Sequence, residues 1–334
     1  MTETPSISPV EKPFYVIGIC TRHRNALLER LLRSLWSQPS PQSARIEVVI
    51  MDNAESPSVP ANLFDLPEKF PIHLHHEPRA GLVFARNALF NVVEGLGADA
   101  ALCIDDDVEV ADDWLEAWIL GLQRLSGEIL IGTTTFIYDG DISPLHPQKQ
   151  FPVRREAARP AVFSGANFAI RRRLIDATVG EGLRFDLDFN NTGGEDSEIM
   201  LRAERAHGAA VQSCPTAKVT EIREGGRVAM HYQLQRRYRD RINGLRIFRK
   251  HQQAGIKKDS RPFWLHVLVL LNRNVFRGLQ QVLIAAARFP FNQTASQRNL
   301  GSALEHFARI GGIFGYFWGK TIQEYGQPIN RDSV

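Results

Sequence analysis

The sequence is poor in cysteine and contains no long apolar run, and both absences exclude classes of protein. Its 334 residues include three cysteines, Cys20, Cys103 and Cys214, which lie in apolar surroundings without CxxC spacing. A disulfide framework and a cysteine zinc site are therefore excluded, and a reducing compartment is favoured. No stretch approaches the length of about 18 uncharged apolar residues that a spanning helix needs. The first residues, with Glu3 and Glu11, do not resemble a secretory signal.

Acidic residues are scarce in one part of the chain, although the whole carries a formal net charge of only +3. Residues 227–288 hold fourteen Lys and Arg against two acids, so this block carries +12 and the remainder −9. Such an asymmetry indicates separate catalytic and attachment regions. The predicted organisation is a disordered N-terminus at 1–13, a catalytic domain at 14–226, a basic amphipathic helical region at 227–328 and a tail at 329–334.

The first half alternates apolar strand-like runs with segments of helical spacing, which is typical of an α/β sheet with mostly parallel strands. The predicted strands are 14–20, 46–51, 72–75, 100–104, 128–138 and 163–170. The predicted helices are 25–37, 83–93, 114–125 and 195–207, with a helical region from Met230 that breaks near Gly255, Pro262 and Pro290. Ligands bind at the carboxyl ends of strands in such sheets, and polar residues at these ends favour a nucleotide-sized ligand.

Three consecutive carboxylates, Asp105, Asp106 and Asp107, follow the apolar run 100–104. Adjacent carboxylates repel one another and resist desolvation, and a divalent cation relieves both costs. Their hard oxygen ligands suit Mg²⁺ or Mn²⁺. The alternative is an acidic turn that caps the helix beginning near Trp114.

Five motifs occur in a fixed order between about Tyr15 and Arg249. They are IGICTRHRN (17–25), VVIMDNA (48–54), GLVFARNALF (81–90), IDDDVEV (104–110) and TGGEDSEIMLRAERAHG (192–208). Together they resemble the family 2 inverting glycosyltransferases of the GT-A fold, in particular bacterial exopolysaccharide and lipopolysaccharide transferases of the succinoglycan glucosyltransferase type. The resemblance implies a Rossmann-like central sheet flanked by helices, here with a C-terminal helical extension, and a UDP-sugar donor with Mn²⁺ or Mg²⁺.

The resemblance also implies which residues meet the donor nucleotide. They are Thr21, Arg22, Asp52, Arg86, Asp105 and Asp106. Thr21 and Asp52 would meet the uridine, where a carboxylate suits the uracil N3–H, and Arg86 would support the nucleotide or diphosphate. A turn-forming role is the alternative for Asp52, and an exposed helical position is the alternative for Arg86.

By the same resemblance, Asp107 binds the metal directly, and Asp105 reaches the ribose or a metal-bound water. His231 is a further candidate metal ligand, because neutral imidazole binds Mn²⁺ well, and a solvated surface histidine is the alternative.

Glu195 and Asp196 follow two glycines at the start of a predicted helix, where the helix dipole favours carboxylates. The resemblance makes Asp196 the general base that deprotonates the acceptor hydroxyl. Gly165, Ala166, Asn167 and Glu195 would form the wall that binds acceptor and donor sugar. The alternative for Glu195 and Asp196 is that they only complement the helix N-terminus.

The predicted function is therefore inverting, metal-dependent transfer of a hexose, with glucose as the first expectation. The donor is a UDP-sugar, and the acceptor is a hydroxyl of a glycan or of a polyprenyl-diphosphate-linked oligosaccharide. A nucleotidyltransferase acting on a sugar phosphate is an alternative, but it normally has a glycine-rich loop after the first strand, and residues 20–25 contain no glycine. A non-catalytic membrane-bound scaffold, the other alternative, would not need both Asp107 and Asp196.

The basic C-terminal region interleaves arginines with aromatic and aliphatic residues. This pattern predicts peripheral attachment of a cytoplasmic protein to the anionic inner face of a bacterial plasma membrane. Nucleic-acid binding and a packed helical cap are the alternatives, and the transferase motifs argue against nucleic acid. The segment 300–325 places Leu304, Phe307, Phe314 and Trp318 on one helical face, which is expected to pack on the catalytic domain, to pair in a homodimer or to touch lipid.

Overall fold

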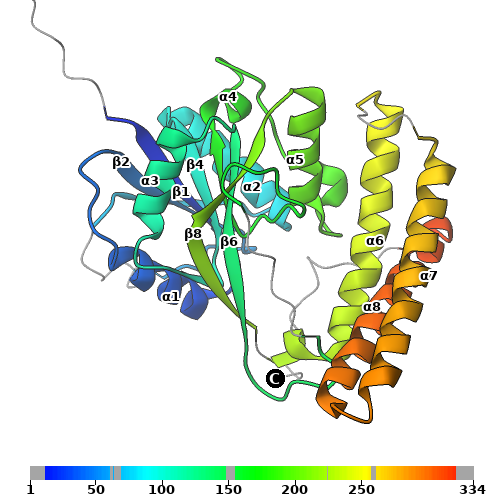
Figure 1. Ribbon diagram of the computed structural model, residues 1–334. Coiled ribbons are helices and arrows are strands. Elements are labelled where there is room, and N and C mark those ends of the chain that lie inside the picture. The colour runs from blue at the N-terminus through cyan, green and yellow to red at the C-terminus, as the bar shows by residue number, and fades with distance from the viewer. Residues whose placement is uncertain are drawn as a thin grey trace, which may run out of the picture.

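The computed structural model describes residues 12–60, 63, 69–147, 155–223, 225–256 and 261–320. An eight-stranded sheet with flanking helices is followed by three long helices that stand beside it (Figure 1). The predictions for residues 1–13 and 329–334 fall, except at residues 12 and 13, outside the described residues. No helix in the described ranges combines the length and the apolar character that crossing a membrane requires.

The structure gives the following bounds. The strands are β1 (Phe14–Thr21), β2 (Arg45–Asp52), β3 (Ile72–His76), β4 (Ala100–Asp105), β5 (Val108–Val110), β6 (Ile129–Tyr138), β7 (Asn167–Arg171) and β8 (Val211–Arg223). The helices are α1 (Asn25–Trp36), α2 (Leu82–Leu96), α3 (Trp114–Arg124), α4 (Arg172–Ile175), α5 (Glu195–Ala206), α6 (Met230–Gln253), α7 (Phe263–Arg288) and α8 (Gln293–Phe317), with short 3₁₀ turns η2 (Leu187–Phe189) and η3 (Gly225–Val228).

The sheet has the strand order β3-β2-β1-β4-β7-β6-β8-β5. Strands β3, β2, β1 and β4 are parallel, as predicted, whereas β7 runs antiparallel to both β4 and β6. Strands β6 and β8 are parallel, and the short β5 pairs antiparallel with β8. The carboxyl ends of β1, β2 and β4 therefore meet at one edge, which confirms the α/β class and brings the predicted polar residues together.

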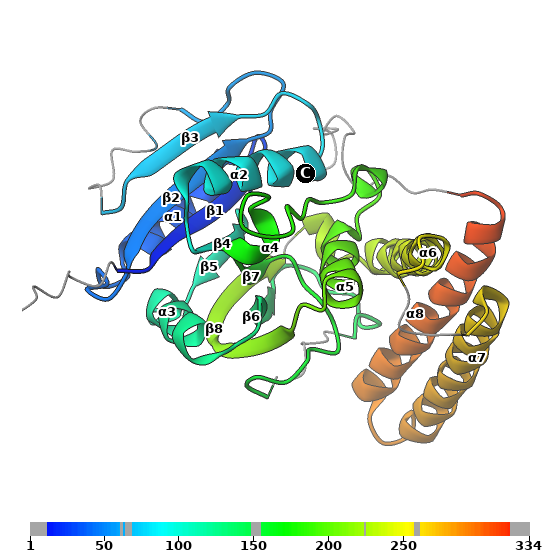
Figure 2. The ribbon, with the colours of Figure 1, turned by 90° about the horizontal axis from the view of Figure 1, so that it is seen from above.

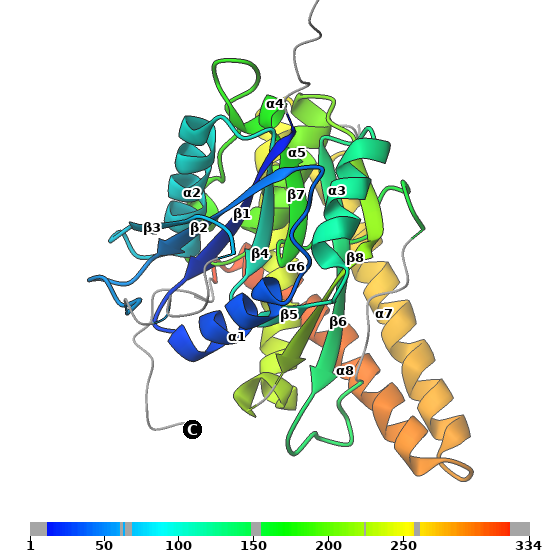
Figure 3. The same ribbon diagram turned by 90° about the vertical axis from the view of Figure 1, so that its left-hand side faces the viewer.

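Two apolar cores lie on opposite faces of the sheet, because side chains alternate along each strand. In β1, Ile17 faces the core formed with α1 and α3, and Val16 faces the core formed with α2 and α5. Figure 3 shows these helices covering the two faces. Each central strand is buried on both sides, which explains its nearly continuous apolar sequence.

The sheet differs from the sequence prediction at two places. Strand β8 is not apparent in the sequence pattern, because Pro215 and several polar residues interrupt its apolar positions; a register shift in its pairing with β6 lies between Ile131 and Thr133. The predicted strand 163–170 is wrong for its first four residues, since β7 begins at Asn167. The preceding residues, including Gly165, instead line the cleft described below.

The C-terminal helices form a layer of their own. Helix α6 lies between the α/β part and the hairpin of α7 and α8, and α7 lies outermost (Figure 2). Glycines permit α8 to lie close to α6, since a Cβ at Gly312 would meet the carbonyl oxygen of Tyr238 at 2.4 Å. The predicted breaks near Gly255, Pro262 and Pro290 are confirmed, because each falls between two of these helices.

Candidate active site

A polar cleft of about 410 Å³ opens between the sheet edge and helix α6. Asp105 and Asp107 line it from the end of β4, while Glu195 and Asp196 line it from the start of α5. Gly165 and Ala166 form the wall between them. Residues that lie about 90 positions apart in the sequence thus share one cavity.

Arg86 links the two acidic groups. From α2, its guanidinium contacts Asp105 at 3.2 Å and Glu195 at 2.9 Å, and both Arg86 and Glu195 are buried. Burial alone would lower the pKa of Arg86, but the carboxylates of Glu195, Asp105 and Asp196 raise it. Arg86 is therefore a permanent cation at the centre of the cleft, and the alternative of an exposed helical position is wrong.

Asp105 has an unusual acidity for an aspartate. Desolvation raises its pKa to about 7, with Asp107 and Asp106 adding to the effect and Arg86 opposing it. Its side chain nevertheless remains 39% exposed, so it faces the cleft and not the core. Such a carboxylate is poised to gain a cationic partner, because a nearby positive charge favours its ionised form.

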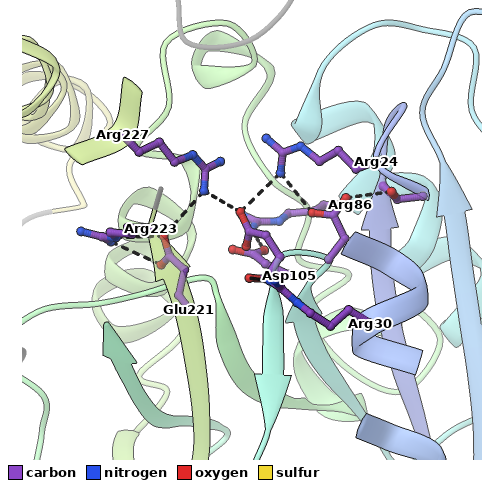
Figure 4. Close-up of polar contacts among 10 residues, drawn as sticks. Arg24, Arg30, Arg86, Asp105, Glu221, Arg223 and Arg227 are labelled. Carbon is purple, nitrogen blue, oxygen red and sulfur yellow. Dashed lines mark hydrogen bonds and ion pairs between the residues drawn. The ribbon is translucent and has the colours of Figure 1, made fainter. Parts of the chain in front are cut away.

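Asp106 and Asp107 are held by residues from other elements, among them Arg24 and Arg227, which Figure 4 shows on either side of Asp105. Thr21 at the end of β1 donates a hydrogen bond of 2.7 Å to Asp106, and Arg24 contacts Asp106 at 3.1 Å. Arg227 contacts Asp107 at 2.7 Å and also lies 3.7 Å from Glu221. Arginines therefore share the charge of the acidic triplet, which the sequence reasoning attributes to a metal alone.

Two residues of the acidic triplet, Asp105 and Asp107, would fit a divalent metal if a substrate completed its coordination. Asp105 and Asp107 offer hard carboxylate oxygens to the cleft, but the described residues contain no group of three His, Cys, Asp or Glu side chains arranged to hold an ion. Mg²⁺ is commonly bound by one or two carboxylates together with phosphates of the substrate, so two are sufficient. His231 is exposed on the first turn of α6, where Tyr232 lines the cleft instead.

Asp196 lies in the first turn of α5 with both carboxylate oxygens oriented. The backbone N–H of Gly165 donates to it at 3.0 Å, and that of Ser197 at 2.6 Å. A Cβ at position 165 would lie 3.0 Å from both Arg86 and the Cβ of Asp196, so glycine permits this approach. The carboxylate is partly exposed and lines the cleft, as a base acting on an incoming hydroxyl must.

Other predicted site residues have structural partners in this molecule. Asp52 is 2% exposed and accepts hydrogen bonds from the backbone of Ala54, Ser58 and Val59 and from the Ser58 hydroxyl. It therefore organises its loop, as the turn-forming alternative describes. Its contact with uracil stays a prediction.

Arg22 and Asn167 also lie apart from the cleft lining. Arg22 pairs with the exposed Glu55 at 2.5 Å. Asn167 is 1% exposed, accepts from Trp114 Nε1 at 3.0 Å and donates to the Ala217 carbonyl at 2.9 Å. This amide joins three elements within the core, while the neighbouring Ala166 lines the cleft.

The wall of the cleft formed by α6, η3 and the end of β8 is rich in arginine and was not predicted from the sequence. Helix α6 presents Tyr232, Arg236, Asn243 and Ile247 from one face, since successive positions are spaced by four or seven residues. Arg223 and Arg227 add two more cations from the end of β8 and from η3. The basic block in the sequence contains these arginines, but helical spacing alone does not identify them, because Arg236, Arg237 and Arg239 all line the cleft.

Comparison with known proteins agrees with this site. Residues 16–179, which contain the acidic triplet and Arg86, match the model of Glycosyl transferase family 2. Residues 16–179 form a family 2 glycosyltransferase domain. This glycosyltransferase is 26% identical over 321 residues to the succinoglycan biosynthesis protein ExoM of Rhizobium meliloti (strain 1021), covering 93% of this chain and 95% of that relative.

Solved structures show the same GT-A fold for this glycosyltransferase. The mannosyltransferase PcManGT of Pyrobaculum calidifontis, in complex with GDP-Man and Mn²⁺, aligns with a TM-score of 0.58 at 16% identity, covering 95% of this chain and 91% of that chain. S. aureus TarS 1-349, in complex with UDP-GlcNAc, aligns with a TM-score of 0.50 at 14% identity, covering 96% and 98%. Both of these neighbours are complexes with a sugar nucleotide.

Proposed function

We propose that this glycosyltransferase transfers a hexose from a UDP-sugar to a hydroxyl of a glycan, with inversion at the anomeric carbon, in bacterial surface polysaccharide synthesis. The observation that carries the proposal is the arrangement around Arg86, which contacts Asp105 on the donor side and Glu195 beside Asp196. One cleft thus holds carboxylates for a cation and its diphosphate next to a carboxylate placed to act as a base. The printed name of the Rhizobium relative, a succinoglycan biosynthesis protein, supports the process.

The reaction follows from this arrangement. Asp196 accepts the proton of the acceptor hydroxyl, and the oxygen forms a bond to the anomeric carbon from the face opposite the diphosphate. The bond between that carbon and the diphosphate oxygen breaks, and UDP leaves with the electron pair. An α-linked donor then gives a β-linked product. A positioned base of this kind contributes about 10²–10⁴-fold to the rate.

Charge on the leaving diphosphate is stabilised by groups that line the cleft. Mn²⁺ or Mg²⁺, held by Asp105 and Asp107, would supply positive charge to the diphosphate oxygens. Arg227 and Arg236 lie on the opposite wall and suit phosphate oxygens, since guanidinium groups bind them in a bidentate manner. Arg227 contacts Asp107 through Oδ2 at 2.7 Å, so the guanidinium and a bound cation would share this carboxylate.

The nucleotide and sugar are the finer parts of the proposal. Of the two structural neighbours, one holds GDP-Man and the other UDP-GlcNAc, so both nucleotides need testing. Calorimetric titration of UDP and GDP, with and without Mn²⁺, tests the donor site. We expect UDP to bind more tightly than GDP and to need Mn²⁺ for full affinity. Failure of UDP and of UDP-sugars to bind in the presence of metal would overturn the proposal.

The acceptor and the location complete the proposal. We infer a glycan or polyprenyl-diphosphate-linked acceptor, and a peripheral position at the inner face of the plasma membrane. The arginine-rich wall suits an anionic acceptor, and the basic C-terminal region suits an anionic surface. Release of UDP from UDP-glucose, measured with lipid extracts as acceptor, tests the acceptor class, and a response to water-soluble glycans alone would exclude the lipid-linked form.

A further inference from the structure

Helix α7 carries apolar side chains on the face that it turns away from the rest of the molecule. Phe276 and Leu283 are 69% and 70% exposed, and Trp264, Leu268 and Leu279 are exposed on the same side. At 100° per residue these positions fall within about 120° of the helix circumference. The inward face is closed separately by Val267, Leu270, Asn274, Gly278 and Ala285. A surface helix normally presents polar residues outward, so this outward face lacks its ordinary composition.

The exposed apolar surface continues from α7 onto α8. Phe307 of α8 packs where Gly278 of α7 leaves room, since a Cβ at Gly278 would lie 2.9 Å from the Phe307 ring, and Phe307 is still 40% exposed. Leu304, Phe314 and Trp318 are exposed on the same stripe of α8. The predicted packing of this stripe on the catalytic domain is therefore wrong, and homodimer and lipid contact remain as its possible partners.

The charge around this surface has one sign. Between residues 260 and 318 the chain has six arginines and one acid, Glu305, which is 1% exposed and pairs with Arg237 at 3.2 Å. Arg273 and Arg277 lie beside the apolar face of α7, and both are exposed. An apolar face bordered only by cations is complementary to anionic lipid headgroups over a hydrocarbon layer. A second copy of the same face would oppose like charges across a two-fold axis, which disfavours a homodimer here.

The turn between α7 and α8 also combines exposed apolar side chains with neighbouring arginines. Phe289 and Phe291 are 60% and 90% exposed at this tip, on either side of Pro290. Beside them a hollow of about 560 Å³ is lined by Arg288 and Arg298, together with amide and hydroxyl side chains. Arginines next to exposed aromatic rings suit a headgroup phosphate and the adjoining acyl region.

We propose that the outward face of the α7–α8 hairpin, with its Phe289–Phe291 tip, is the surface by which this protein docks on an anionic lipid bilayer. The hairpin lies on the side of α6 away from the α/β part, so the catalytic domain remains free above the membrane (Figures 1 and 2). This inference rests on the membrane location proposed above but not on the transfer reaction. Vesicle binding tests the docking surface and nucleotide binding tests the donor site, so one proposal can fail while the other holds.

Flotation of the full chain with vesicles tests the docking surface. The probes are phosphatidylcholine vesicles with and without phosphatidylglycerol, across a salt series. The test variant is Phe276→Glu/Leu283→Glu, whose positions are so exposed that the fold should not change. The matched control is Val179→Glu/Leu187→Glu, because these positions are 58% and 54% exposed on the catalytic domain and add the same charge.

We expect the parent to float with the anionic vesicles at low salt and to be released as salt rises. Burial of one large aliphatic or aromatic side chain is worth about tenfold or more in partitioning, so the test variant should bind at least about tenfold more weakly. The control should stay within about threefold of the parent, because both of its positions lie outside the α7–α8 hairpin. Circular dichroism verifies that both variants are folded.

Three results would overturn the inference. The first is a parent that ignores anionic vesicles at low salt, and the second is a test variant that binds as well as the control. The third is a parent dimer, seen by sedimentation, that the test variant converts to monomer without any change in vesicle binding. If parent and test variant bind single-stranded DNA equally and neither binds vesicles, the partner of the basic region is nucleic acid. That outcome is one form of the first result.

Discussion

Replacing Asp196 by asparagine separates the proposed base from the donor site, because the side chain keeps its shape but can no longer accept a proton. Loss of a general base costs about 10²–10⁴-fold in kcat, or about 2.7–5.4 kcal/mol in the activation barrier. UDP affinity should stay within about threefold, since the phosphates are expected at Asp105 and Asp107 on the other side of Arg86.

The same substitution has a cost in stability that follows from its hydrogen bonds. Both carboxylate oxygens accept backbone N–H groups, from Gly165 at 3.0 Å and Ser197 at 2.6 Å. An asparagine presents an NH₂ group to one of these donors, which leaves it unsatisfied at a cost of about 1–3 kcal/mol. A globular domain has about 5–15 kcal/mol in total, so the variant should remain folded.

The assay measures UDP release and product formation by the parent and Asp196→Asn, with UDP titrated calorimetrically into each. The matched control is Glu116→Gln, which neutralises an exposed carboxylate in the first turn of α3, far from the cleft. Loss of a first-turn charge alone costs about 0.3–1 kcal/mol and should leave kcat unchanged. A variant Asp196→Asn with kcat within about fivefold of the parent would refute the assignment, and equal loss of UDP binding would mark Asp196 as structural.

Three further predictions concern stability. Asn167→Ala should lower the free energy of unfolding by about 2–4 kcal/mol in urea titrations, because Trp114 Nε1 and the Ala217 carbonyl lose a buried partner; an unchanged midpoint would contradict this. Gly312→Ala should lower the free energy of unfolding by about 1–3 kcal/mol, and with it the melting temperature, through its clash with the Tyr238 carbonyl. Gly311→Ala, whose Cβ meets only the Tyr238 ring at 3.4 Å, should not, and equal effects would contradict this packing. Burial raises the pKa of Glu198, but hydrogen bonds from His251 and Arg202 outweigh it and lower the pKa overall. The ionised carboxylate therefore adds to the free energy of unfolding above the unfolded pKa of about 4.3, and this stabilisation is lost as pH falls through the lower folded pKa. Between about pH 6 and 3 the parent should lose more of its free energy of unfolding than Glu198→Gln does. The same pH dependence in both proteins would refute the direction of the pKa shift.

The order of strands and helices, and the placement of carboxylates at strand ends, could be predicted from sequence because they depend on local periodicity. Apolar runs mark the strands that are buried on both faces, and the acidic triplet directly follows one of them. The position of Asp196 could also be predicted, since two glycines and several acidic residues mark the start of α5. Strand β8 escaped prediction, because its partners and not its own pattern hold it in the sheet.

Sequence by itself determined the α/β class, the carboxylates at the sheet edge, the acidic residues at the start of α5 and the three C-terminal helices. Only the tertiary structure decided which charges meet: Arg86 between Asp105 and Glu195, and Arg227 against Asp107. It also decided that Asp52 closes its own loop, that Asn167 turns into the core, and that the apolar stripe of α8 stays exposed. The physical reason is that periodicity fixes which face of an element is apolar, whereas the partner of each face or charge depends on elements distant in the chain.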